Sequence, residues 1–590
     1  MARIVQKFGG TSVADCEKIL AAARRAIRAQ QEGNQVVMVV SAMGKNTDML
    51  VDLAGQITDT PSARETDMLL STGEQVSVAL MAMAIHSLGH QAVSLTGAQI
   101  GIRTDSIHTK ARIISISTER LERLLEEGNI VIAAGFQGID EDLNITTLGR
   151  GGSDTTAVAL AAVLGADACE IYTDVDGVYT TDPRKLPEAR RVDRVSYDEM
   201  LELASLGAGV MHSRSIEFAK KFHVPIHVRS SFSDPPGTMI VAQPESSQRP
   251  VSGAAVTRDE ARITVWGVPD KPGTSLDIFA DIAADNISVD MIVQNVGEDG
   301  LADISFTVLK DDLRETLALV EQTAERLNAE SVSHDDGLAK ISVVGLGMAK
   351  QTGVAHQMFR ALADASINLL MITTSEIKIS VLLQRDQAQE ALQIVHHVFG
   401  LHQPPEANGD DPSNDNPEKL DATDVVARLQ GMEDLAIDDI AMDDTQARVT
   451  ISGVPDTPGV AAHVFEEVAA AGVMVDMIVQ SFGRNELADL SFSVPQSDLD
   501  ACLKTAESLS VQFNCGAVTS SPRIAKLSVS GIGMRSHADV AIRMFRALAE
   551  AGINVEMINT SEMRVNAVVD GAHGARGLAC LEEALADAIR

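Results

Sequence analysis

Two glycine-rich segments of this sequence could bind phosphate. The first, Lys7-Phe-Gly-Gly-Thr-Ser-Val13, follows a short apolar run and precedes a helical pattern that opens near Asp15. Glycines let the backbone approach a phosphate closely, a helix N-terminus supplies free N–H groups, and Lys7 adds a full positive charge. An ordinary strand-to-helix turn would explain the Gly-Gly pair about half the time, because short glycine motifs are frequent by chance.

The second segment, Gly149-Arg-Gly-Gly-Ser-Asp154, also stands at the start of a helical pattern. Ser153 or Asp154 could serve as the helix N-cap, and Arg150 could present a bidentate cation to a carboxylate or phosphate. A Ser-Asp cap is sufficient on structural grounds alone. Such a cap does not require an arginine flanked by three glycines, so we favour a binding role.

A third segment, residues 172–184, combines acidic, aromatic and basic side chains in the order Tyr-Thr-Asp-Val-Asp-Gly-Val-Tyr-Thr-Thr-Asp-Pro-Arg. It leaves an apolar run, turns at Asp176-Gly177, and carries Tyr179 and Arg184. Open α/β sheets bind ligands in loops at the carboxyl ends of their strands. The structural alternative is an Asp-Gly turn with solvated charges.

The net charge limits what these segments can bind. The 590 residues carry a formal charge of −35, which repels nucleic acid, anionic membranes and nucleotides alike. An anionic ligand therefore has to be held by local cations, backbone N–H groups and a metal ion. Because no Lys/Arg-rich face is visible, we expect neither a nucleic-acid nor a membrane partner.

Several common sites and signals are missing. The five cysteines are scattered without Cys-x-x-Cys spacing, so we expect no disulfide framework and no protein-bound metal. The sequence has no G-x-x-x-x-G-K-[ST] loop, no G-x-G-x-x-G fingerprint and no His-Glu-x-x-His site. We see no leader before residues 4–8 and no apolar run near the roughly 18 residues of a membrane span, and we expect a cytoplasmic protein.

Alternating strands and helices must position the three segments. Apolar, often β-branched runs at residues 4–8, 36–41, 92–95, 130–135, 168–173 and 225–229 alternate with helical patterns. This alternation predicts an α/β fold, an α/β/α sandwich with a mainly parallel sheet. We assign it to residues 1–245.

The remainder of the chain repeats itself. Gly267-Val-Pro-Asp-Lys-Pro-Gly273 returns, 186 residues later, as Gly453-Val-Pro-Asp-Thr-Pro-Gly459, and the other repeated segments keep that offset. Each copy splits into two similar βαββαβ units, which predicts four modules. We assign the first pair to residues 246–402 and the second to residues 421–590, with a flexible acidic linker at residues 403–420.

Five motifs in order resemble those of the aspartokinases of the amino-acid kinase family. They are KFGGTSV at residue 7, SAMGKNTD at residue 41, STGEQVS at residue 71, GRGGSD at residue 149 and TDVDGVYTTDPR at residue 173. The modules after Pro250 resemble the paired ACT domains of these enzymes, in the monofunctional form with four ACT modules. The resemblance implies transfer of the ATP γ-phosphate to L-aspartate, the first step towards lysine, threonine and methionine.

The resemblance also implies the catalytic and binding residues. Lys7 and Asp154 would be catalytic, with Asp154 orienting Lys7 or the metal–phosphate cluster. ATP, with Mg²⁺ held mainly by its phosphates, would contact Lys7, Phe8, Gly9, Gly10, Thr173, Asp174, Tyr179 and Arg184. L-Aspartate would contact Ser41, Thr47, Glu74, Arg150, Gly151, Gly152, Ser153 and Asp154, with Arg150 pairing a carboxylate and Glu74 facing the ammonium.

The ACT modules imply feedback inhibition by lysine, threonine or both, and a homodimer formed through these modules. The implied effector contacts are Asp270, Gly273, Gln294, Asn368 and Leu369, with the repeat equivalents Asp456, Gly459, Gln480, Asn554 and Val555. The two asparagines could instead be mere turn formers. The second copy could equally be kept for packing alone.

Two positions depart from the family pattern. Gly209 stands where many relatives carry Lys or Arg near the nucleotide, which puts one ATP contact in doubt unless Arg214 or Lys220 compensates. Ser213 stands where many relatives carry Pro. One alternative function is a kinase for glutamate, acetylglutamate or a nucleoside monophosphate, which the second and third motifs and the ACT repeats oppose. Another is an amino-acid sensor with an inactive kinase half, which the retained Lys7 and Arg150 oppose.

Overall fold

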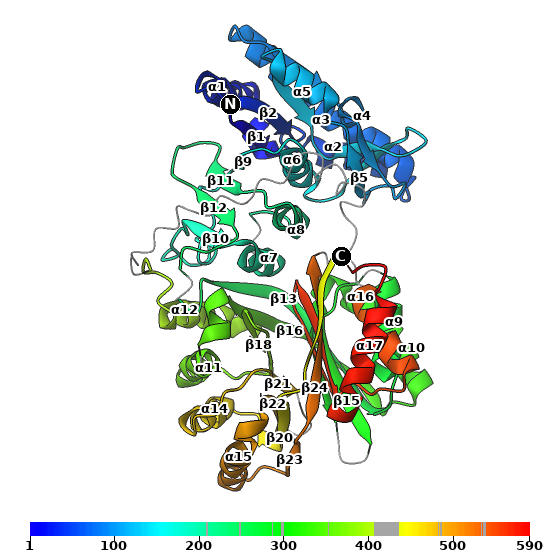
Figure 1. Ribbon diagram of the computed structural model, residues 1–590, viewed down its shortest axis with the longest axis vertical. Coiled ribbons are helices and arrows are strands. Elements are labelled where there is room, and N and C mark those ends of the chain that lie inside the picture. The colour runs from blue at the N-terminus through cyan, green and yellow to red at the C-terminus, as the bar shows by residue number, and fades with distance from the viewer. Residues whose placement is uncertain are drawn as a thin grey trace.

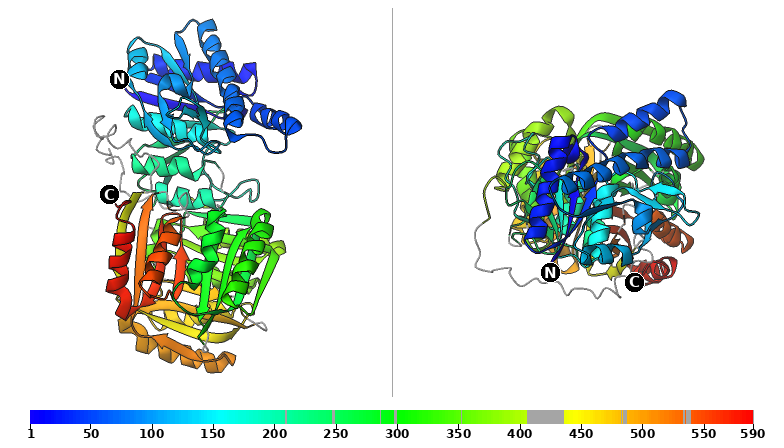
Figure 2. Two further views of the ribbon diagram at one scale, coloured as in Figure 1. Left: turned by 90° about the vertical axis from the view of Figure 1, so that its right-hand side faces the viewer. Right: turned by 90° about the horizontal axis from the view of Figure 1, so that it is seen from above.

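The protein consists of two parts stacked along its long axis (Figure 1). The computed structural model describes residues 1–207, 210–246, 249–285, 287–296, 300–351, 353–405, 436–481, 483, 487–532, 534 and 539–589. The chain begins in the upper, N-terminal part and then builds the lower, C-terminal part, as the left-hand view of Figure 2 also shows. The predicted linker at residues 403–420 lies mostly outside the described residues, as does Gly209.

The N-terminal part is built on an eight-stranded sheet. β1 pairs in parallel with β2 and β9, and β6 pairs in parallel with β2 and β3, whereas β11 and β12 are antiparallel. The predicted mainly parallel sheet is therefore confirmed. In spatial order its strands are β10 (Arg194–Ser196), β12 (Thr238–Val241), β11 (Ile226–Ser230), β9 (Ala168–Thr173), β1 (Arg3–Phe8), β2 (Gln35–Val40), β6 (Ile130–Ala134) and β3 (Ala92–Leu95).

Helices cover both faces of this sheet. Alternate residues of one strand enter different cores: Val37 and Val39 pack in one, Val36 and Met38 in the other, because successive strand side chains point to opposite faces. The α/β/α sandwich is thus confirmed. The helices are α1 (Cys16–Gln31), α2 (Asn46–Ile57), α3 (Ala63–Ser87), α4 (Gly97–Ile100), α5 (Glu119–Glu126), α6 (Gly152–Val163), α7 (Tyr197–Ser205) and α8 (Ser213–Lys221), with a 3-10 turn η1 (Gly10–Val13).

A small second sheet, which we did not predict, lies beside α3. Its four strands are β5 (Ile113–Ile116), β4 (Ile102–Thr104), β7 (Gln137–Ile139) and β8 (Ile145–Thr147). Strands of three or four residues are too short for alternation to reveal them in a sequence.

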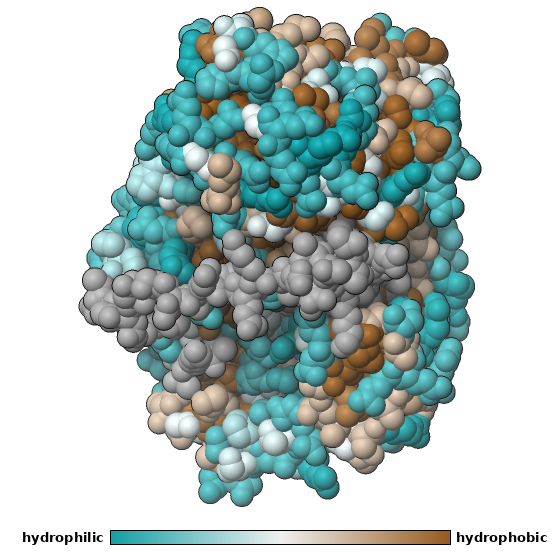
Figure 3. Space-filling view, turned by 45° about the horizontal axis from the view of Figure 1, so that its top comes forward, coloured by the Kyte–Doolittle hydropathy of each residue, from teal (hydrophilic) through white to brown (hydrophobic). Residues whose placement is uncertain are grey.

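One helix among the described residues, α3, is long and apolar enough to cross a membrane, contrary to our reading that no run approaches that length. More than half of its most apolar window, 56%, is buried inside the protein, and the core helix of a globular domain passes the same test. The face of the molecule in Figure 3 is mostly hydrophilic, with hydrophobic residues scattered over it.

The C-terminal part contains four modules. Module 1 comprises β13 (Gly253–Pro269), α9 (Thr274–Ala284), β14 (Asp290–Val296), β15 (Leu301–Leu309), α10 (Leu313–Leu327) and β16 (Ser331–Val344). Module 2 adds α11 (Val354–Asp364), β17 (Met371–Thr374), β18 (Lys378–Gln384) and α12 (Ala388–Val398) to β16. Module 3 comprises β20 (Gln446–Pro455), α14 (Val460–Ala470), β21 (Ile478–Ser481), β22 (Leu487–Pro495), α15 (Leu499–Phe513) and β23 (Val518–Ser521). Module 4 comprises β19 (Ala436–Asp443), β24 (Ile524–Ile532), α16 (Asp539–Glu550), β25 (Met557–Thr560), β26 (Arg564–Asp570) and α17 (Gly574–Ala584).

The two copies of the repeat are interleaved rather than stacked as separate units. β17 of module 2 pairs antiparallel with β21 of module 3, so modules 1, 2 and 3 share one ten-stranded sheet. Modules 2 and 3 also share one hydrophobic core, and modules 1 and 4 share another. Each module therefore shares its hydrophobic core with a module from the other copy.

Candidate functional site

The predicted ligand-binding segments meet at one edge of the eight-stranded sheet. β1, β2, β6 and β9 are parallel, so their carboxyl ends lie side by side. Backbone hydrogen bonds join the loops that leave them: Gly9 N–H donates to Tyr172 O at 3.3 Å, and Ser41 N–H donates to Phe8 O at 3.1 Å. This edge is where an open α/β sheet presents loops to a ligand.

Lys7 and Asp154 form an ion pair at this edge. Lys7 Nζ lies 2.6 Å from Asp154 Oδ1, and each side chain is 12% exposed. Asp154 is in the first turn of α6, but the N-cap is Gly151, with φ +72°. Our prediction of Ser153 or Asp154 as N-cap was therefore wrong, since both residues lie inside the helix, where Ser153 Oγ would be 2.6 Å from a Cβ on Gly135.

The glycines of the first motif leave room beside the lysine. A Cβ on Gly9 would lie 3.6 Å from Lys7 Nζ, and a Cβ on Gly10 would lie 2.8 Å from Ala42 O. Any side chain at Gly10 would therefore push the two loops apart. The helix after this loop opens as predicted, because Asp15 caps α1 by accepting from Lys18 N–H at 2.9 Å.

Glu74 is a buried carboxylate on α3, only 3% exposed. Its Oε1 accepts from Ala42 N–H at 3.1 Å, and its Oε2 is buried without a hydrogen-bond partner among the described residues. Burial raises the pKa of Glu74 to about 7, although hydrogen bonds from backbone N–H groups act in the opposite direction. An ammonium group would satisfy such a carboxylate. Ser41 follows β2, and Thr47 is in the first turn of α2.

The second motif wraps around the start of α6. Gly149 and Gly151 have positive φ values of +77° and +72°, and a Cβ on Gly151 would lie 2.4 Å from His212 Cβ. A Cβ on Gly152 would meet Leu148 Cβ at 2.9 Å, so the backbone here permits no side chain. Arg150 lies between these glycines. Its side chain is exposed and is long enough to reach a ligand bound at this edge.

The predicted nucleotide residues divide into two groups. Thr173 is the last residue of β9 and Asp174 follows it, next to Tyr172, which accepts a hydrogen bond from Gly9. The Phe8 side chain instead stacks on Tyr172 in the core, with ring centroids 4.7 Å apart, so that only its backbone can reach a ligand. Tyr179 and Arg184 lie further along the loop, where Tyr179 donates to Asp176 and Arg184, 88% exposed, pairs with Asp182.

The ten predicted effector residues come together in two equivalent seams. In the seam between modules 2 and 3, Asn368 Nδ2 donates to Asp456 Oδ1 at 2.8 Å. In the seam between modules 1 and 4, Asn554 Nδ2 donates to Asp270 Oδ1 at 2.7 Å. The asparagines therefore join modules from different copies, which a mere turn former would not do.

The glutamines reinforce the same two seams. Gln480 Nε2 donates to Leu369 O at 2.7 Å, and Gln294 Nε2 donates to Val555 O at 3.0 Å. Gly273 and Gly459, with φ of +100° and +96°, are the N-caps of α9 and α14. A cavity in the seam between modules 2 and 3 is lined by Asn368, Leu369, Asp456, Gly459 and Gln480.

Asp67 is a site residue that we did not predict: it is a fully buried carboxylate on α3 that accepts hydrogen bonds from the loop before β5 and from the end of β8. Its only sequence signal is its place seven residues before Glu74, on the same face of a helix.

Comparison with known proteins identifies both parts of the chain. Residues 2–230 match the amino acid kinase family, and residues 261–328, 341–399, 449–508 and 527–585 match ACT domains. An aspartate kinase of Pseudomonas putida is 52% identical over 406 residues, which is 68% of this chain and 99% of that protein.

Solved structures give the same result. The aspartate kinase from Synechocystis has 42% sequence identity and a TM-score of 0.53, covering 99% of this chain and 98% of that one. Escherichia coli aspartokinase III with aspartate and ADP has 27% identity and a TM-score of 0.58, covering 67% of this chain and 99% of that one. Its complex with lysine and aspartate has 26% identity and a TM-score of 0.54, with the same coverage.

Proposed function

Because this chain belongs to the aspartate kinases of the amino acid kinase family, it transfers the γ-phosphate of ATP to the side-chain carboxylate of L-aspartate, and we propose that Lys7 and Asp154 lie at the centre of that transfer. Family membership sets aside the two alternatives considered above, a kinase for another acceptor and an inactive sensor. The four ACT matches confirm the predicted form with four ACT modules.

The ion pair between Lys7 and Asp154 is the observation that carries the assignment. A phosphoryl group in transfer spreads negative charge over its oxygens, and a lysine with nearby backbone N–H groups stabilises that charge. Asp154 holds the Lys7 ammonium at the mouth of the glycine loop, where Gly9 leaves space beside it. The aspartate carboxylate is ionised at neutral pH and attacks without a general base.

Glu74 and Arg150 supply the opposite charges that an amino-acid dicarboxylate requires. Glu74 Oε2, which is buried and has no hydrogen-bond partner in the described part of the chain, fits the substrate ammonium, and Arg150 fits a carboxylate through its planar fork of N–H groups. Ser41, Thr47, Gly151, Gly152 and Ser153 complete this proposed pocket. Thr173, Asp174, Tyr179 and Arg184 complete the proposed nucleotide site.

We propose Mg²⁺ as the metal of the nucleotide complex. The residues fit this ion, because the carboxylate oxygens of Asp154 lie beside the glycine loop and Mg²⁺ prefers oxygen ligands. The phosphates would hold it, with Asp154 nearby. When bound, the ion neutralises phosphate charge.

Lysine, threonine or both are proposed to inhibit the enzyme by binding in the two seams. Support comes from the lysine complex of the E. coli relative and from the polar Asn, Asp and Gln side chains of each seam. An effector that binds one arrangement of the modules better shifts the enzyme towards that arrangement.

We also propose a cytoplasmic location, where the five free cysteines would stay reduced. We further propose a homodimer that forms through the outer faces of the ACT modules, since the seams are closed within one chain.

The test is ADP release with Mg²⁺, ATP and L-aspartate, for wild type and Lys7→Ala, with lysine and threonine added singly and together. We expect aspartate-dependent turnover that Lys7→Ala abolishes and that at least one amino acid suppresses. Turnover without an amino-acid effect would remove the regulatory proposal and leave the site. Full activity of Lys7→Ala would remove the site assignment.

A further inference from the structure

We propose that Asp67 is a positioning residue for the aspartate pocket, which it shapes by tying the backbone that leads into Arg150 to the helix that carries Glu74. The inference rests on the proposed assignment of Glu74 and Arg150 to aspartate binding. Asp67 itself touches neither substrate nor reacting atoms.

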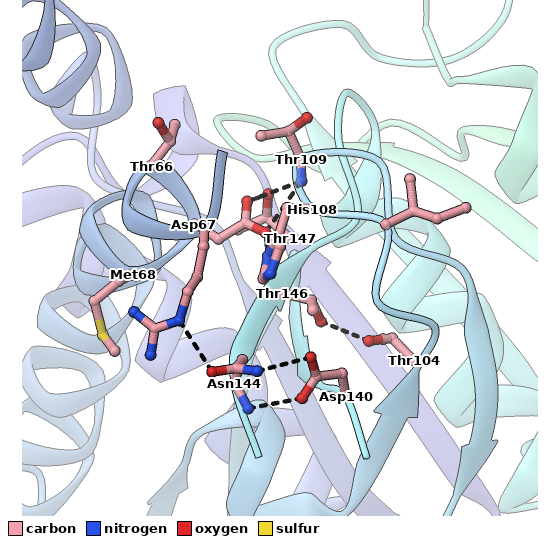
Figure 4. A network of polar contacts seen from close by, with 12 residues as sticks. Thr66, Asp67, Met68, Thr104, His108, Thr109, Asp140, Asn144, Thr146 and Thr147 are labelled. Carbon is pink, nitrogen blue, oxygen red and sulfur yellow. Dashed lines mark hydrogen bonds and ion pairs between the residues drawn. The ribbon is translucent and has the colours of Figure 1, made fainter. Parts of the chain in front are cut away.

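The carboxylate of Asp67 binds two separate segments at once (Figure 4). Its Oδ1 accepts from Thr147 Oγ1 at 2.5 Å, and its Oδ2 accepts from His108 Nδ1 at 2.7 Å. Thr109 N–H lies within hydrogen-bonding distance of both oxygens, at 3.1 and 3.0 Å. Asp67 is fully buried, so these bonds replace all of its hydration.

One of these segments continues into Arg150, and the other lies against the backbone just before it. Thr147 ends β8, three residues before Arg150, and its carbonyl accepts from Ala111 N–H at 2.9 Å. A Cβ on Gly149 would lie 3.0 Å from Thr109 O, so the 105–111 loop passes close to the start of the second motif and leaves no room there for a side chain. A shift of the 105–111 loop therefore reaches the backbone before Arg150 through the hydrogen bond from Ala111 to Thr147.

Thr109 has an unusual backbone that needs such support. Its φ of +68° is in the left-handed region, which a β-branched residue rarely adopts. Such a conformation persists only where surrounding contacts hold it, and these conformations cluster at functional sites. The paired hydrogen bonds from Thr109 N–H to Asp67 supply that hold.

A single rigid element carries Asp67 and Glu74. They are seven residues apart on α3, which is about two helical turns, and both belong to its buried face. Glu74 accepts from Ala42 N–H on one side of the pocket, while Asp67 holds the backbone before Arg150 on the other. The helix thereby sets the separation of the two charges that the substrate must bridge.

Asp140 provides a control within the same region. It is also buried, and it accepts from Asn144 N–H at 2.8 Å and Asn144 Nδ2 at 3.0 Å, closing the turn between β7 and β8 (Figure 4). Both of these side-chain hydrogen bonds end at Asn144, outside residues 147–150, so the loss of Asp140 tests fold stability without removing a contact to the pocket.

The experiment compares Asp67→Ala, Asp67→Asn and Asp140→Ala by steady-state kinetics of the full-length enzyme. Misplacement of about 1 Å in a binding group can cost about 100-fold, so we expect Asp67→Ala to raise KM for aspartate at least about tenfold. KM for ATP should stay within about twofold, because Lys7 and Gly9 lie on other elements. Asp67→Asn keeps one acceptor oxygen and should give an intermediate KM.

Asp140→Ala should lower the unfolding temperature and leave KM for aspartate within about twofold. If Asp67→Ala behaves like Asp140→Ala, or raises both KM values equally, the inference is overturned. If Asp67→Ala fails to fold, Thr147→Val replaces it in the assay, because this change removes one hydroxyl at nearly constant shape. A raised KM for aspartate supports the proposal, and an unchanged KM overturns it.

Glu74→Gln in the same assay distinguishes the positioning role of Asp67 from the assignment of the aspartate pocket itself. If Glu74→Gln raises KM for aspartate and Asp67→Ala does not, the positioning role fails and the pocket assignment stands. If neither variant changes it, the pocket assignment itself fails, and with it the inference.

Discussion

Glu202 Oε2 lies 2.9 Å from Lys378 Nζ, with the two side chains 0% and 8% exposed. Glu202 is on α7 of the kinase part, whereas Lys378 begins β18 of module 2. Glu562 N–H, in module 4, donates to Glu202 Oε1 at 3.0 Å. One kinase carboxylate therefore contacts both copies of the regulatory repeat, and the two parts cannot move independently at this point.

Lys378→Met is expected to weaken feedback inhibition. It leaves Glu202 buried without its cation, and removal of one partner of a buried pair costs about 3–5 kcal/mol. Burial already raises the pKa of Glu202, and Lys378 opposes that rise, so the variant should lose more stability at pH 8 than at pH 6. In the ADP-release assay, we expect the variant to need at least about a fivefold higher inhibitor concentration than wild type for half-inhibition. Its kcat without inhibitor should stay within about twofold of the wild-type value.

The control for this prediction is Arg564→Met. Arg564 is the repeat equivalent of Lys378 and pairs with Glu376 inside the regulatory part. Its loss should leave the response to inhibitor closer to wild type. Equal inhibition curves for wild type and Lys378→Met would show that this contact does not couple the two parts.

Lys7→Ala and Asp154→Asn are expected to act on kcat. Removing one group that stabilises transition-state charge typically costs about 100- to 1,000-fold, and we expect that loss for Lys7→Ala. Asp154→Asn should cost about tenfold or more, because the amide no longer fixes the ammonium. Lys18→Ala, at a half-exposed position on α1, should retain full activity in the same ADP-release assay; a similar loss there would point to general damage.

Aspartate binding is expected to depend on the ionisation of Glu74. Because burial raises the pKa of Glu74 to about 7, the free enzyme carries a neutral side chain at pH 6 and a carboxylate at pH 8. Only the carboxylate pairs with the substrate ammonium, so kcat/KM for aspartate should rise with an apparent pKa near 7. Glu74→Gln should be flat across this range, and a parallel rise in that variant would refute the assignment.

The same group predicts a stability change of defined sign. A folded pKa of about 7 lies above the ordinary 4.5, so the native state binds this proton more tightly than the unfolded chain does. The resulting stabilisation is full below the unfolded pKa and is lost as pH rises through about 7. Denaturant unfolding at pH 5 and pH 8 should therefore differ more for wild type than for Glu74→Gln.

Asn368→Ala and Asn554→Ala test the two seams separately. Each removes the hydrogen bond from one module to the aspartate of another, Asp456 or Asp270. If both seams bind effector, each variant should raise the half-inhibitory lysine or threonine concentration about tenfold while kcat stays near wild type. A change in only one variant assigns the effector to that seam, and normal inhibition in both would remove the seams as effector sites.

The fold class and the motifs were predictable because they depend on local order along the chain. Strands 4–8 and 168–173 appear as apolar runs of ordinary length, and the helix after Asp15 is set by a cap three residues from its partner. The small sheet at β4 and β5 was missed because its strands are too short to show a period. The expected cap at Ser153 was wrong because Gly151 adopts a left-handed conformation that composition does not reveal.

The sequence by itself determined the parallel sheet, the glycine loops with Lys7, and the repeat that makes four ACT modules. Tertiary structure alone decided that Lys7 meets Asp154, that Asn368 bonds to Asp456 and Asn554 to Asp270, and that Glu202 is enclosed by Lys378 and Glu562. The physical reason is the distance along the sequence over which each interaction acts. Backbone conformation and periodicity act over a few residues, whereas these contacts join groups far apart in the chain and exist only once the cores that bring their elements together have packed.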